Sequence, residues 1–111
     1  VVTRLESVGA DFTYSGDRGP GRDLIELATG TDTLLCEAAI QGVRDADTYP
    51  YHLTAFEAGE IAAATGAHEL VLTHISSRLD PQLSIDQAAG AFVGPISYAA
   101  PATTFAVPTR E

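Results

Sequence analysis

The sequence predicts an α/β fold with a largely parallel core sheet and antiparallel margins. Short apolar runs at Thr33–Cys36 and Glu69–Thr73 are typical of strands buried on both faces. Segments with helical spacing of apolar residues alternate with these runs, and alternation of strand and helix indicates βαβ units. Capping and stop residues mark the ends of the helical segments.

The first part of the chain predicts a hairpin followed by a short helix. Residues 1–7 are rich in β-formers, Val8-Gly9 supplies a turn, and Phe12–Ser15 can return as the second strand. A Gly-flanked turn over 16–21 then holds Asp17 at its tip. Leu24, Leu27 and Ala28 have helical spacing within 23–28, and Gly30 can stop that helix.

The second predicted helix has the clearest local signature. Thr54 and Glu57 form a Thr-x-x-Glu capping box, and Gly66 closes the helix. The residues expected on its inner face are Ala55, Ala58, Ile61 and Ala62. The polar segment 42–51 before it is expected to be a surface loop.

A third helix is predicted after the strand 69–73. Asp80 caps it and Pro81 is its first residue. Its expected inner stripe is Ile85, Ala88, Ala89 and Phe92. Gly94-Pro95 breaks the helix, and two short strands are expected near 96–98 and 104–107.

Composition restricts the classes of function. The 111 residues suffice for at most one domain, and no apolar run approaches the length of about 18 residues needed to cross a bilayer. Fifteen acidic residues against six basic ones, all Arg, give a net charge of −9, which argues against holding a nucleic-acid backbone by charge. Cys36 stands alone, so we expect a small core residue in a reducing cytoplasm.

Chemically useful side chains follow several predicted strands. Asp17 comes after the hairpin, Glu37 after the run ending at Cys36, and His74 after the strand 69–73. In open α/β sheets, ligand sites lie beyond the carboxyl ends of the strands. We therefore expect these three side chains to face one site, with His52 brought in by a loop.

Four short motifs in this order give the chain a family resemblance. Tyr14-Ser15-Gly16-Asp17, Cys36-Glu37-Ala38, His52-Leu53-Thr54-Ala55 and Leu72-Thr73-His74 together resemble the metallo-β-lactamase superfamily. The chain looks most like the branch that contains ribonuclease Z and bacterial cyclic-nucleotide phosphodiesterases. The resemblance covers essentially all of residues 1–111, and it corresponds to the C-terminal half of that family's domain.

The resemblance implies an αββα sandwich with two divalent metal ions, Zn or Mn, at the edge between its sheets. In the family, a His-x-His-x-Asp-His motif and one further His supply most ligands from the N-terminal half, which is absent here. Asp17 is similar to the carboxylate that bridges both metals, and His74 to the final histidine ligand. Arg18 stands where the family usually has Thr.

The same resemblance implies the catalytic roles. His52, in a His-x-Thr loop, matches the residue that protonates the leaving group, and Glu37 matches the carboxylate that orients it. Arg78 is a candidate contact for a substrate phosphate. Each residue has a structural alternative: a turn residue for Asp17, a core histidine for His74, an ordinary strand-end carboxylate for Glu37, a loop residue for His52 and a surface Arg for Arg78. His68 is expected to be solvated.

The expected function is metal-dependent hydrolysis of a small phosphodiester such as a cyclic nucleotide. The alternatives are a thioester or lactone hydrolase of the same fold, or a non-catalytic fragment that needs a partner chain. A sheet this short with helices mainly on one face leaves the other face to be covered, so we expect a second layer from elsewhere. The N-terminal half, a partner chain or a homodimer would supply that layer, and the 111 residues alone are expected to be inactive.

Overall fold

The computed structural model describes residues 3–7, 10–16, 22–42, 52–75 and 78–99. Over these ranges the elements are β1 Thr3–Ser7, β2 Ala10–Tyr14, α1 Arg22–Ala28, β3 Thr33–Glu37, α2 Ala55–Thr65, β4 Glu69–Thr73, α3 Pro81–Ala89 and β5 Ile96–Tyr98. The predicted α/β fold is confirmed. The turn after residue 16, most of the expected loop before residue 52 and the expected strand 104–107 lie outside the described residues.

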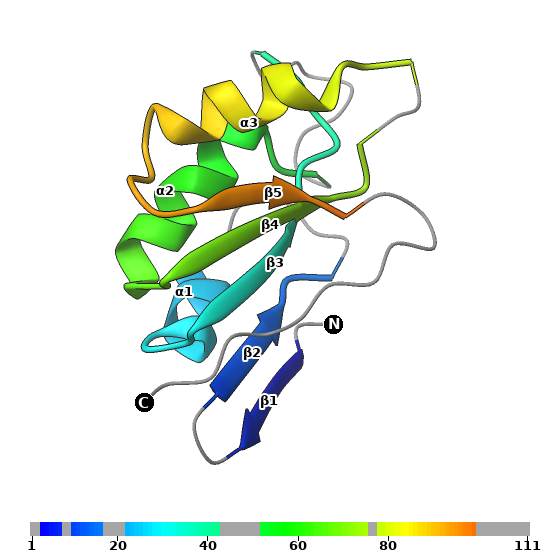
Figure 1. Ribbon diagram of the computed structural model, residues 1–111. Helices are drawn as coiled ribbons and strands as arrows, with labels where there is room; N and C mark the ends of the chain where they lie inside the picture. The colour runs from blue at the N-terminus through cyan, green and yellow to red at the C-terminus, as the bar shows by residue number, and fades with distance from the viewer. Residues whose placement is uncertain (1–2, 8–9, 17–21, 43–51, 76–77, 100–111) are drawn as a thin grey trace.

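The sheet is mixed, and its strands are arranged in the order of the sequence, β1-β2-β3-β4-β5. The β1–β2 pair is antiparallel, and the other three pairs are parallel. The prediction of antiparallel margins is therefore confirmed at β1 and wrong at β5. Crossovers between neighbouring parallel strands are almost always right-handed, so successive helices fall on the same side of the sheet. Figure 1 shows α1, α2 and α3 together on one face, as the sequence predicts.

The core lies between that face and the helices. Leu34 pairs with Leu70 and Cys36 with Leu72, and all four are buried in one apolar cluster with Leu24 of α1 and with α2. Side chains alternate across a strand, so the next positions along β3 and β4 point to the opposite face. Leu35 there is half-buried and Val71 is buried. This face therefore carries apolar side chains as well.

The predicted ends of the second helix and the predicted start of the third are confirmed. The predicted end of the third helix at Gly94-Pro95 is wrong, because α3 ends at Ala89 with Gly90 as its C-cap. The Thr54 hydroxyl accepts from the Glu57 amide at 3.0 Å, and the Glu57 carboxylate accepts from the Thr54 amide at 2.8 Å, which completes the capping box. Gly66 ends α2 with φ 75°, a left-handed conformation that favours glycine. The Asp80 side chain accepts from the Gln82 amide at the start of α3.

The predicted inner stripe of α3 is partly wrong. Ser84 and Ala88 are the buried residues of the helix, whereas Ala89 is exposed. Helix α2 approaches α3 closely at Gly59, where an added Cβ would lie 2.4 Å from the Ala88 carbonyl oxygen. This contact turns Ala88 toward α2 and leaves Ala89 outside. Phe92 is buried as expected, but it follows the end of the helix.

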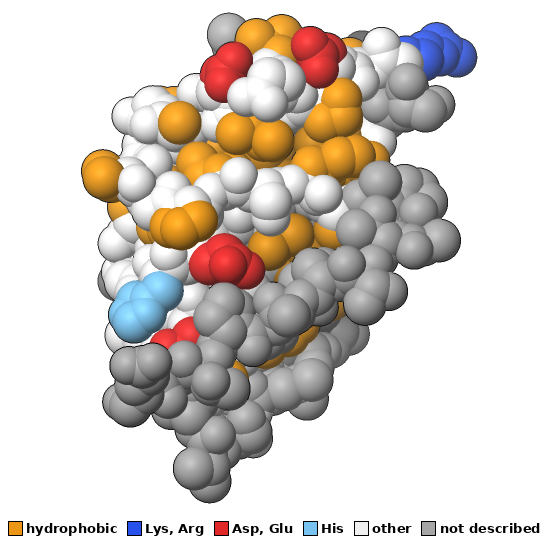
Figure 2. All heavy atoms as spheres, in the orientation of Figure 1, with side chains coloured by type: hydrophobic (Ala, Val, Ile, Leu, Met, Phe, Trp, Pro, Cys, Tyr) orange, Lys and Arg blue, Asp and Glu red, His pale blue; other side chains and the backbone are white. Residues whose placement is uncertain are grey.

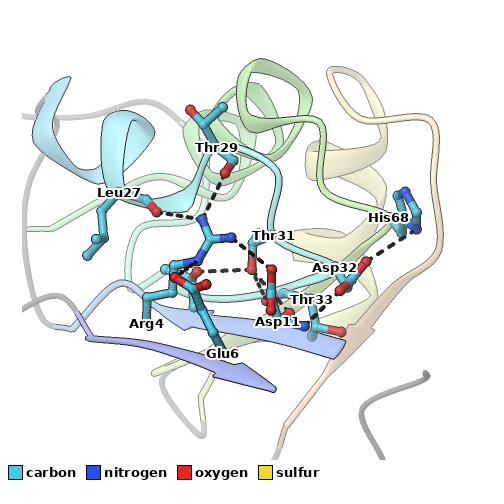
Figure 3. A network of polar contacts seen from close by, with 10 residues as sticks. Arg4, Glu6, Asp11, Leu27, Thr29, Thr31, Asp32, Thr33 and His68 are labelled. Carbon is cyan, nitrogen blue, oxygen red and sulfur yellow. Dashed lines mark hydrogen bonds and ion pairs between the residues drawn. The ribbon is translucent and has the colours of Figure 1, made fainter. Parts of the chain in front are cut away.

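A polar network fastens the opposite edge of the sheet, at the amino ends of β3 and β4 (Figure 3). The Arg4 guanidinium pairs with Asp11 at 3.0 Å and donates to the carbonyls of Leu27 and Thr29 at 2.8 Å. The Asp32 carboxylate accepts from the Asp11 amide at 2.7 Å. These bonds join β1 and β2 to the end of α1 and the start of β3.

None of the helices in the described ranges is long and apolar enough to cross a membrane. On the face shown in Figure 2, the described Lys and Arg side chains appear at one corner only. The described part of this face therefore offers little positive charge to a polyanion.

Candidate active site

Three of the predicted site residues lie together at the carboxyl edge of the sheet. Glu37 is the last residue of β3 and pairs with Thr73, the last residue of β4. His74 follows directly, and His52 stands three residues before the start of α2. The parallel register of β3 and β4 thus places Glu37 and His74 at neighbouring strand ends.

Glu37 is a fully buried carboxylate held on both oxygens. Its Oε1 accepts from the Leu53 amide at 2.7 Å, and its Oε2 accepts from the Ala39 amide at 2.9 Å. The Glu37 amide in turn donates to the Ser15 hydroxyl at 2.9 Å. Two fixed backbone donors leave the carboxylate little freedom to rotate, so its orientation is set by the fold.

Burial raises the pKa of Glu37 above its ordinary value of 4.5. The two backbone hydrogen bonds and the nearby imidazoles of His52 and His74 act in the opposite direction, but desolvation is the larger effect. A buried carboxyl group between two histidines is the type of arrangement found at sites of proton transfer.

His52 faces this carboxylate. Its Nδ1 lies 3.6 Å from Glu37 Oε1, beyond hydrogen-bond distance, and has no hydrogen-bond partner among the residues that the structure describes. The side chain is 33% exposed while Nδ1 itself is buried. The ring therefore presents Nδ1 to Glu37, while the side chain as a whole is partly exposed.

The backbone around His52 is tied to the segment after β3. Ile40 and Thr54 form a parallel bridge, the Ile40 amide donates to the Leu53 carbonyl at 3.2 Å, and the Ala55 amide donates to the Ile40 carbonyl at 3.1 Å. The Leu53 amide also donates to the Glu37 carboxylate, so Leu53 is held both by Ile40 and by Glu37. The bonds of the residues that follow His52 therefore fix the position of its backbone at the start of α2.

His74 is exposed and has an unusual backbone conformation. Its φ is 64°, in the left-handed region that few residues other than glycine adopt. Its ring lies 5.5 Å from that of His52, centroid to centroid, at an interplanar angle of 57°. Residues held in such conformations cluster at functional sites.

The remaining predicted residues are placed less fully. Asp17 and Arg18 lie outside the described residues, and the residue before them, Gly16, is buried with φ 69°. Arg78 is exposed in the turn before α3. His68 is exposed, as expected, and lies at the opposite edge of the sheet, 3.8 Å from Asp32.

Of the two predicted metal ligands, His74 lies among the described residues. His74 offers an exposed imidazole, which is a common ligand of Zn. Within residues 3–7, 10–16, 22–42, 52–75 and 78–99, no three His, Cys, Asp or Glu side chains form a group that could hold a metal. Further ligands, with Asp17 the candidate in this sequence, would be needed to complete a site.

The structure adds groups that residue patterns do not reveal. Glu37 is oriented by the main-chain amides of Leu53 and Ala39, and a backbone donor has no signature in the sequence. Ser15 belongs to one of the motifs, but a lone serine at a strand end gives no sign of bonding a residue in the next strand.

We expect Glu37→Gln to lower the free energy of unfolding by about 1–3 kcal/mol, since an amide nitrogen would face the Leu53 or Ala39 N–H and leave it unsatisfied. Urea unfolding of the complete protein at pH 7 measures the change. Glu60→Gln, at an exposed position of α2, is the control and should be nearly neutral. Equal stability of both variants would contradict the carboxylate's two-sided anchoring.

Comparison with known proteins finds relatives over most of the chain. An uncharacterised protein of Mycobacterium leprae is 38% identical over 104 residues, which are 93% of this chain and 36% of that protein. A ribonuclease Z of Myxococcus xanthus is 34% identical over 106 residues, 93% of this chain and 34% of that protein. The chain thus spans about a third of the length of these relatives.

The fold has a solved counterpart as well. The metallo-β-lactamase fold protein YhfI of Bacillus subtilis superposes with a TM-score of 0.76 at 24% identity, covering 88% of this chain and 46% of that one. No family model matches the sequence.

Proposed function

We propose that this chain is the C-terminal half of a metal-dependent phosphodiesterase, because it has the metallo-β-lactamase fold and is similar over most of its length to a ribonuclease Z. The complete protein would act on a small phosphodiester such as a cyclic nucleotide. The observation that carries this proposal is the closeness of His52 to both the buried carboxylate of Glu37 and the exposed ring of His74.

This arrangement suits general acid catalysis. An alkoxide leaving group needs a proton as its bond to phosphorus breaks, and a histidine within reach can supply it. Glu37 faces the Nδ1 of His52, so the proton would leave from Nε2. The 3.6 Å separation is loose for a hydrogen bond, and catalytic bonds commonly tighten when substrate binds.

His74 and Asp17 would be this chain's ligands to the metal ions, Zn or Mn, with the remaining ligands from the N-terminal half. When bound, such a metal pair clamps a phosphodiester and supplies hydroxide near neutral pH. His74 would be held in position by its left-handed backbone.

The apolar face of the sheet opposite the helices supports the assignment to half of a domain. Val71 and Leu35 point to this side, where an αββα sandwich would place its second sheet. Val71 is already buried within this chain, and in this proposal the rest of the protein covers Leu35, which is half-buried.

The charge of the chain favours a compact substrate. With its net charge of −9, the chain repels a polyanion, whereas each phosphate contact to a nucleic acid needs a cationic side chain. A cyclic nucleotide has one phosphodiester, which the metals alone could attract. The Myxococcus relative is named ribonuclease Z, so RNA is the second candidate substrate.

A substrate comparison with the complete protein tests these alternatives. With Mn or Zn supplied, we expect hydrolysis of a 3′,5′-cyclic nucleotide, slower cleavage of a structured RNA and no turnover of a thioester. Faster cleavage of RNA than of the cyclic nucleotide would reject the compact substrate and keep the phosphodiesterase. Turnover of the thioester alone would reject the phosphodiesterase.

A further inference from the structure

The Ser15 hydroxyl connects two parts of the candidate site. Ser15 is fully buried, and its Oγ accepts from the Glu37 amide and donates to the Gly16 carbonyl, both at 2.9 Å. Glu37 carries the carboxylate that faces His52, and Gly16 is the residue before Asp17. The Ser15 side chain thus forms hydrogen bonds to the main chain of both Glu37 and Gly16.

This bond takes the place of a rung in the sheet. The β2–β3 ladder continues as far as the Ser15 amide, which donates to the Leu35 carbonyl at 2.9 Å. In a regular parallel ladder the next donor, the Glu37 amide, would bond a main-chain carbonyl of the neighbouring strand. Here the serine hydroxyl accepts instead, which frees the chain to turn away at Gly16, where φ is 69°.

We propose that Ser15 is a positioning residue that fixes the Glu37–His52 pair relative to the end of β2 and Gly16. This inference rests on the proposed function. A hydroxyl is required because it accepts from one buried group and donates to another, whereas an alanine would leave the Glu37 amide and the Gly16 carbonyl without these partners. Both strand ends would then be free to shift relative to one another.

Ser15→Ala in the complete protein tests the proposal. Since a displacement of about 1 Å can cost up to about a hundredfold in rate, we expect kcat for a cyclic nucleotide to fall about ten- to hundredfold with KM nearly unchanged. The side-chain ¹⁵N resonances of His52 should also shift, because Glu37 moves relative to its ring. If Ser15→Ala does not fold, Ser15→Cys, with its weaker acceptor, takes its place.

Thr13→Val is the matched control. Thr13 lies on the same strand, is fully buried, and donates its hydroxyl to Thr31 at 3.0 Å. This variant loses a comparable buried hydrogen bond, so its melting temperature should fall similarly while kcat and the His52 resonances stay near those of the wild type. A purely structural role for Ser15 would make the two variants alike.

The outcomes separate this inference from the proposed function. Unchanged His52 resonances in Ser15→Ala, or an equal loss of kcat in Thr13→Val, would overturn the positioning role. A wild-type protein without phosphodiesterase activity would refute the proposed function. In that case the His52 resonances alone decide on Ser15: a shift supports its role and no shift overturns it.

Discussion

Replacing His52 by alanine in the complete protein is expected to lower kcat for a cyclic nucleotide by about 10²–10⁴-fold, the usual contribution of general acid catalysis. The reason is the geometry of one ring: Nδ1 is buried opposite Glu37, and the remainder of the side chain is partly exposed. Steady-state kinetics at pH 7 with saturating metal measure the loss.

The dependence on the leaving group makes this prediction specific. An activated aryl phosphodiester has a leaving group that departs without a proton, so His52→Ala should slow its hydrolysis far less. His68→Ala is the control, because that histidine is exposed at the opposite edge of the sheet. Equal losses for the two substrates in His52→Ala would contradict the role of acid, and a loss in His68→Ala would point to a general effect on folding.

The local features of the fold were predictable because they depend on neighbours in the sequence. The capping box of Thr54 and Glu57 needs only a spacing of three residues, and the buried strand 69–73 was delimited by its own apolar run. The rotation of α3 could not be predicted from the sequence, because it depends on the close approach of Gly59 to Ala88, two residues that are far apart in the chain. Hence Ala89 was assigned to the wrong face.

The sequence predicts which strand ends carry the residues of the candidate site. Parallel strands present their carboxyl ends at one edge, so Glu37 and His74 were expected near each other, and the register of β3 and β4 has this arrangement. The complete burial of Glu37 and its bonds to the Leu53 and Ala39 amides depend on the return of the chain at residues 52–54. No residue pattern encodes that return.

The left-handed backbone of His74 has a further consequence for the design of variants. A branched residue that replaces His74 at φ 64° would strain the backbone by about 1–3 kcal/mol. A loss of activity in such a variant could then result from unfolding instead of from the missing imidazole. Asparagine tolerates this conformation better than other non-glycine residues. His74→Asn therefore removes the imidazole and preserves the backbone.

We expect His74→Asn, and likewise Asp17→Ala, to lose roughly a thousandfold or more of the phosphodiesterase activity of the complete protein, since a bound metal contributes several kcal/mol of charge stabilisation. Bound Zn or Mn, measured on the purified variants, should fall in parallel, and added metal should not restore the rate. The melting temperature without metal should stay close to the wild type for His74→Asn. Full metal content with normal turnover in either variant would remove that residue from the ligand set, and the same result in both would leave this chain without a part in the metal site.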